Sequence, residues 1–128
     1  MKLTAILATI ILSVMAIAQT AASIENAFNN LEIVLKNGNC GSVESAIFHS
    51  VKLKLFHPDK DTEKLESEIH RLIEDGETET IRYIAYLAYQ FLRTPGLLAK
   101  VEKKDYKNGD EFFQLLSDVM TTQLLVNR

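Results

Sequence analysis

The chain has 128 residues, of which 47% are hydrophobic and 24% are charged, with two prolines, one cysteine and no tryptophan. These figures fit one compact domain or a few helical repeats, and they exclude a multidomain enzyme, a collagen-like chain and a disulfide-rich miniprotein. The formal net charge is −3 at pH 7. A mildly acidic surface argues against nucleic-acid binding, which needs clustered lysine and arginine.

The N-terminal segment has the three parts of a secretory signal peptide. Lys2 precedes an apolar run from Leu3 to Ile17, and the small residues Ala16 and Ala18 precede the expected cleavage point. The run is shorter than the roughly 20 residues that a membrane-spanning helix needs. We therefore expect residues 1–18 to be removed and the protein to be exported to the periplasm or secreted, without membrane attachment.

The predicted mature protein, residues 19–128, is a more ordinary chain than the whole sequence. Cleavage removes Lys2, so thirteen basic residues face seventeen acidic ones and the net charge becomes −4. Cys40 is the single cysteine, so a monomer forms no internal disulfide. Helix packing must then supply the stability, and the cysteine is expected to be a packed or weakly exposed thiol.

Apolar residues recur at helical spacing along the mature chain, and turn signals separate the segments. Asn37-Gly38-Asn39, Pro58, Gly76 and Pro95 mark the breaks. A loop is expected over residues 103–109. The predicted helices cover residues 23–36 with Ser23 as cap, residues 43–57, residues 62–75, residues 79–93, a short turn at 97–101, and a last helix capped by Asp110.

The buried face of each predicted helix follows from the same spacing. Residues 51–55 alternate as a strand would, but no partner strand is visible, so we interpret them as helix. Glu66, Glu68, Arg71 and Glu74 are expected to point outward. The predicted inward residues are Val43, Ala46, Ile47, Ser50, Val51 and Leu55; Leu65, Ile69, Leu72 and Ile73; Ile81, Ile84, Ala85, Ala88 and Leu92; and Phe112, Leu115, Leu116, Val119 and Gln123, with Phe113, Met120 and Leu124 beside the last group.

Two segments of the chain resemble each other with a period of 37 residues. Aligning residues 41–58 with residues 78–95 matches Ile47 with Ile84, Leu55 with Leu92, and the two prolines. Residues 81–88, with an aliphatic residue, Arg82 and then small residues, resemble the second helix of a HEAT-type repeat. The resemblance implies an all-α fold of stacked antiparallel helix hairpins, with repeats over about 23–58 and 61–95, a C-terminal cap over 96–128, and a scaffold that binds another protein.

The string His57-Pro58-Asp59-Lys60 suggests an alternative function. It resembles the HPD loop of J-domain co-chaperones, in which the tripeptide stimulates the ATPase of a heat-shock chaperone. The helices on either side lack other residues of that family's pattern. A simpler interpretation is a helix stop whose Asp59 or Asp61 caps the next helix.

The sequence predicts no metal site, cofactor or catalytic residue. Asp59, Asp61 and Glu63 alternate as in a calcium loop, but Lys64 and His70 occupy the positions that need glycine and glutamate. His49, His57 and His70 are eight and thirteen residues apart, whereas paired histidine ligands on a helix are three or four apart. A non-catalytic module is therefore expected.

A stripe on the fourth predicted helix is the candidate partner-binding site. Arg82, Tyr86, Tyr89 and Arg93 follow one another at spacings of four, three and four, which places them on one face. Tyrosine and arginine are enriched at interface hot spots, and they form cation–π pairs. The alternative is that the tyrosine rings pack against the third or fifth helix.

Overall fold

The computed structural model describes residues 22–126, so the predicted signal peptide, residues 1–18, lies outside the described residues. The chain forms two units, Met1–Asn30 and Leu31–Arg128. Residues 22–126 form helices and loops, with no strand among them. The predicted all-α class is therefore confirmed.

The helices occur close to their predicted positions. A first helix covers residues 22–37, which places Ser23 inside the helix rather than before it. It is followed by α2 (Cys40–Phe56), α3 (Glu63–Asp75), α4 (Glu79–Arg93), α5 (Pro95–Lys100) and α6 (Gly109–Val126). Residues 51–55 belong to α2, as predicted. Over residues 22–126, none of the helices combines the length and apolar content needed to cross a membrane.

In the unit Leu31–Arg128, α4 is the central helix, because α3, α2, α5 and α6 all contact it. α2 buries every side chain that its spacing predicts, and it also buries Phe48. Ser50 is fully buried, and its hydroxyl donates a hydrogen bond of 2.7 Å to the carbonyl of Ala46. This bond satisfies the hydroxyl inside the core, where an unpaired polar group is costly.

The chain turns sharply between α3 and α4 at Gly76. Its backbone has an ordinary negative φ of −58°, so the turn does not need glycine for its conformation. A Cβ at this position would lie 2.7 Å from both Ile81 Cγ2 and the Leu72 carbonyl oxygen. Glycine is needed here because the backbone of α3 and the Ile81 side chain of α4 both come too close for a Cβ.

Side-chain caps begin several of the helices. Thr78 accepts a hydrogen bond from the Ile81 amide at the start of α4. The cap position of α3 is Thr62, whose side chain makes no capping bond, but Asp61, one of the two predicted caps, accepts a bond from the Glu63 amide. The predicted cap of the last helix was wrong. Asn108, rather than Asp110, accepts the bond from the Glu111 amide, because α6 begins at Gly109 and Asp110 already lies in its first turn.

An aromatic cluster joins α6 to the rest of the unit. Phe112 is fully buried and meets Phe91 and Tyr106 edge to face, with ring centroids 5.6 and 5.2 Å apart. Tyr106 comes from the loop before α6 and donates a hydrogen bond to the Glu102 carbonyl. Edge-to-face contacts add to the free energy gained from burying these rings, so the loop and α6 are held to α4 together.

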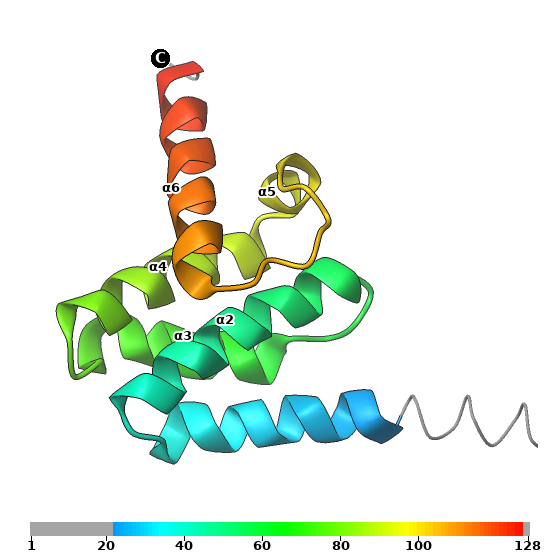
Figure 1. Ribbon diagram of the computed structural model, residues 1–128, viewed down its shortest axis with the longest axis vertical. Helices are drawn as coiled ribbons and strands as arrows, with labels where there is room; N and C mark the ends of the chain where they lie inside the picture. Colours follow the sequence, from blue (N-terminus) through cyan, green and yellow to red (C-terminus); the bar gives the residue numbers. More distant parts are fainter. Residues whose placement is uncertain (1–21, 127–128) are drawn as a thin grey trace, which may run out of the picture. The chain divides into compact units, whose positions relative to one another are not determined.

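The buried side chains of α3, α4 and α6 differ in part from the predicted set. Leu87 and Phe91 are buried although they were not assigned to the core. Ile73, Ile84, Leu115, Val119, Met120 and Gln123 are only half-buried. Leu124 is 71% exposed, because the C-terminal half of α6 extends away from the other helices of its unit (Figure 1).

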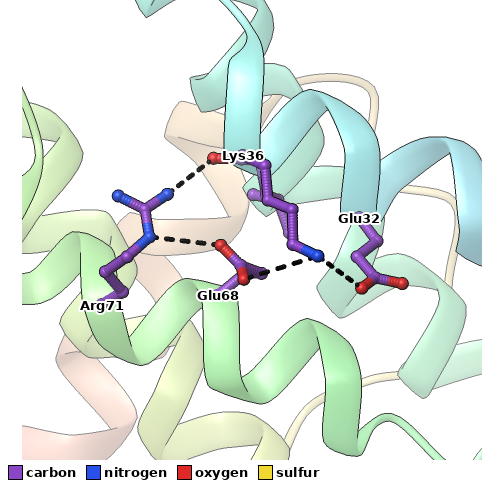
Figure 2. A network of polar contacts seen from close by, with 5 residues as sticks. Glu32, Lys36, Glu68 and Arg71 are labelled. Atoms are coloured by element: carbon purple, nitrogen blue, oxygen red, sulfur yellow. Dashed lines mark hydrogen bonds and ion pairs between the residues drawn. The ribbon is translucent and has the colours of Figure 1, made fainter.

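A polar network connects residues 31–37 of the first helix with α3 (Figure 2). Lys36 Nζ lies 3.0 Å from Glu32 and 4.0 Å from Glu68. Arg71 bonds both Glu68 and the carbonyl oxygen of Leu35. Glu68 and Arg71 were expected to face solvent, but they meet the last turn of the first helix, where a cation suits the helix dipole.

Candidate functional site

The four residues of the predicted stripe lie along one side of α4. The opposite side of this helix provides the buried residues Leu87 and Phe91, and Ala85 and Leu92 flank the stripe on one side. Each stripe residue keeps some contact with solvent: Arg82 and Tyr89 are half-buried, and Tyr86 and Arg93 are exposed. The stripe is therefore on the surface, and two of its members are anchored by neighbouring groups.

Arg82 is fixed to the turn that precedes its own helix. Its Nη1 donates a hydrogen bond of 2.7 Å to the carbonyl of Gly76. Gly76 follows the last residue of α3, where backbone carbonyls lack helical partners. Arg82 therefore stabilises the α3–α4 connection, and its guanidinium is only partly available to another molecule.

Tyr89 and Arg93 form a preassembled pair at the other end of the stripe. Arg93 Nη1 donates a hydrogen bond of 2.9 Å to the Tyr89 hydroxyl, and the guanidinium carbon lies 5.4 Å from the centroid of the ring. The Tyr89 ring also packs against His70 of α3, with centroids 4.7 Å apart and planes tilted by 44°. Tyr89 thus packs on the third helix, as the alternative predicted, and remains partly at the surface, while a binding role for the stripe stays a prediction.

The Tyr89–Arg93 pair borders an open polar groove between α3 and α4. The groove has a volume of about 270 Å³. Its charged groups are two carboxylates and one guanidinium, and Thr62 donates a hydrogen bond to the Glu66 carboxylate. The lining residues are Glu63, Glu66, Ser67, His70, Tyr89 and Arg93.

Tyr86 is the most exposed aromatic side chain of the stripe, at 43%. Another exposed tyrosine, Tyr83, is 53% exposed but lies off the stripe, and its hydroxyl is 2.9 Å from that of Ser117 on α6. The two residues have the same chemistry and similar exposure on one helix. Tyr83 is therefore a matched reference for any role of Tyr86.

The tripeptide of the alternative co-chaperone function lies in the loop between α2 and α3. His57 follows the last residue of α2, and its amide donates to the Leu53 carbonyl. The Lys60 amide then donates to the His57 carbonyl. Pro58 and Asp59 are exposed, and a co-chaperone role for the three residues stays a prediction.

The histidines and the cysteine occupy separate places in the fold. Over the described residues, no three side chains of histidine, cysteine, aspartate or glutamate are grouped as metal ligands. His49 lies beside Phe48 on α2, whereas His70 lies on α3. Cys40 donates a hydrogen bond of 2.7 Å to Glu77. This bond, with burial, raises the pKa of the thiol and disfavours the reactive thiolate.

Sequence reasoning missed the α3 side of the groove. Glu63, Glu66, Ser67 and His70 follow the spacing of one helical face, and this periodicity was visible in the sequence. Nothing in the sequence showed that this face meets the Tyr89 end of α4, because that depends on the antiparallel packing of the two helices.

No family model, curated protein or solved structure matches the chain. The likeness of residues 81–88 to a HEAT-type helix therefore stays a prediction, as does the division into two repeats.

Proposed function

We propose that the protein is an exported, non-catalytic α-helical module that binds another protein through the α4 stripe. The main support is the arrangement of Tyr86, Tyr89 and Arg93 on one exposed side of a capped helix. Tyrosine and arginine are the side chains that contribute most to protein interfaces. Export is supported by the signal-peptide pattern of residues 1–18.

Preorganisation strengthens this proposal. The hydrogen bond from Arg93 and the contact with His70 hold the Tyr89 ring in one place before any partner arrives. Side chains that are already ordered lose less conformational entropy on binding. The fixed Tyr89–Arg93 pair is suited to be the anchor of an interface, and Tyr86 adds adjacent apolar area.

Site-specific photo-cross-linking tests the proposal. A photoreactive phenylalanine analogue replaces Tyr86 in one variant and Tyr83 in a matched control, and each is expressed in the native host. We expect a discrete protein adduct from position 86 and little from position 83. Equal adducts at both positions, or none at position 86, would contradict a binding role for the stripe.

A double substitution of the stripe gives the energetic test. The double variant Tyr86→Ala with Arg93→Ala is expected to bind the cross-linked partner at least tenfold more weakly. Each hot-spot side chain contributes more than about 1 kcal/mol to the binding free energy. Thermal stability should change little, because both side chains are exposed. A large fall in melting temperature without loss of binding would show that the stripe is structural.

A further inference from the structure

A second cleft lies on the other side of α4 from the stripe. It has a volume of about 410 Å³, within the range of ligand-binding pockets. Thr80 and Ile84 line it from α4, and a helix of 3.6 residues per turn places them nearly opposite Tyr86 and Arg93. Nothing in the proposed function uses this cleft, so the two sites can be tested independently.

One face of α2 forms the long wall of the cleft. Its lining residues on this helix recur every three or four positions, which marks a single face over three turns. The rise of an α-helix makes the distance along the wall from Glu44 to Lys52 about 12 Å. These wall residues are Gly41, Glu44, Ser45, Phe48, His49 and Lys52.

The floor of the cleft is apolar. Phe48 and Phe113 are both buried, with ring centroids 6.5 Å apart in an edge-to-face arrangement. Ile84 lies beside them and is half-buried. Gly109 at the start of α6 borders both rings, since a Cβ at that position would lie in ordinary van der Waals contact with Phe48, at 3.6 Å.

The ends of the cleft carry opposite charges. Glu44 lies at the end near the start of α2, and Lys52 lies two turns further along. Lys52 is held at 2.7 Å by Asp105, which brings the loop with Lys107 to the same end. Asp110 adds a carboxylate next to Gly109, beside the floor. Because Asp105 neutralises Lys52, Lys107 supplies the remaining positive charge at this end, and Glu44 makes the other end acidic.

We propose that this cleft binds a short peptide segment of a partner protein that has a basic residue, a central apolar side chain and an acidic residue in that spacing. The basic residue meets Glu44, the apolar side chain covers Phe48 and Phe113, and the acidic residue meets Lys107. Such a segment spans about 13 Å when its charged residues are four positions apart in extended form. This length is close to the roughly 12 Å along α2 from Glu44 to Lys52, whose side chain shares the Asp105 loop with Lys107.

An NMR titration of the isotope-labelled protein with a blocked pentapeptide, Lys-Leu-Phe-Ala-Glu, tests the proposal. We expect saturable shifts of the backbone amides of Ser45, His49 and Gly109, and none along the α4 stripe. Replacing the peptide's phenylalanine by serine should weaken binding at least tenfold. Replacing both of its charged residues by glutamine should weaken binding about fivefold, which corresponds to about 0.5 kcal/mol for each of the two exposed ion pairs.

Charge reversal at one end supplies the specificity test. Lys107→Glu makes both ends of the cleft acidic. The variant should therefore bind the pentapeptide more weakly, and it should bind a version with lysine at both ends more tightly. Lys103→Glu is the control, since Lys103 lies in the same loop outside the cleft, over the ring of Phe56. Ser45→Tyr fills the cleft from an exposed position and should abolish binding. Equal binding of the uncharged peptide, shifts along the stripe, or no saturable shift would overturn the proposal.

Discussion

Cys40 and Glu77 show how one hydrogen bond sets the chemistry of a residue. The thiol donates to the Glu77 carboxylate at 2.7 Å, across 37 residues of sequence. This bond is the main reason that the pKa of Cys40 is raised, and burial adds to the effect. Because the thiolate is the nucleophile, the raised pKa makes Cys40 slow to react.

Glu77→Gln is therefore expected to lower the pKa of Cys40 and to speed its alkylation by iodoacetamide at pH 8. The thiolate fraction rises as the pKa falls, and we expect the rate to increase about threefold. Glu44→Gln is the control, since Glu44 raises the same pKa only weakly. Identical alkylation rates in the Glu77 variant and the unaltered protein would show that the bond does not control the thiol.

Among the elements, α4 has the largest structural role, because both proposed binding sites and much of the core depend on it. Its start is fixed by Thr78, whose side chain accepts the Ile81 amide at 3.1 Å. Gly76 and Arg82 complete the turn before it. If the register of α4 slipped by one residue, the stripe would turn away from the groove with α3.

Thr78→Ala tests the importance of this cap. Loss of the capping bond should reduce the free energy of unfolding by about 1 kcal/mol, which corresponds to a fall of roughly 4 °C or more in melting temperature. Calorimetry or circular dichroism measures the change. Thr80→Ala, in the first turn of the same helix, should change stability much less. Equal losses in the two variants would exclude a special role for the cap.

Over the whole molecule, surface ion pairs occur both within one helix and between separate segments. Lys52 donates to Asp105, and this hydrogen bond and the attraction between the charges lower the pKa of Asp105. The hydrogen bond of Lys36 with Glu32, followed by the attraction of the same carboxylate, raises the pKa of Lys36. Both pairs are in contact with solvent, so each contributes little to the free energy of unfolding, and salt screens the attraction between the charges.

These shifts determine the direction of the pH dependence. The depressed pKa of Asp105 stabilises the folded state at pH values above the pKa of this residue in the unfolded chain. This stability is lost as the pH falls through the folded pKa. The raised pKa of Lys36 adds stability that is lost as the pH rises through its folded value. Urea unfolding at a series of pH values measures these contributions. The free energy of unfolding should fall less at acid pH in Asp105→Asn, and less at alkaline pH in Lys36→Gln, than in the unaltered protein. Profiles that coincide with the unaltered protein would contradict both contributions.

The sequence by itself determined the helices and most of their buried faces. Apolar spacing predicted helices over residues 43–57, 62–75 and 79–93, close to the observed α2, α3 and α4. It also predicted every inward residue of α2, including Ser50. Helical periodicity and turn residues are local properties, so they can be read from neighbouring positions. The same periodicity placed Tyr86, Tyr89 and Arg93 on one side of α4.

Only the tertiary structure decided which helical faces meet. It buried Tyr106 from a loop predicted to be polar, brought His70 against Tyr89, and joined Cys40 to Glu77. It also formed the cleft between α2, α4 and the start of α6. Each of these arrangements depends on helix packing between residues far apart in the chain, and a local pattern of apolar residues does not specify the partner that covers it.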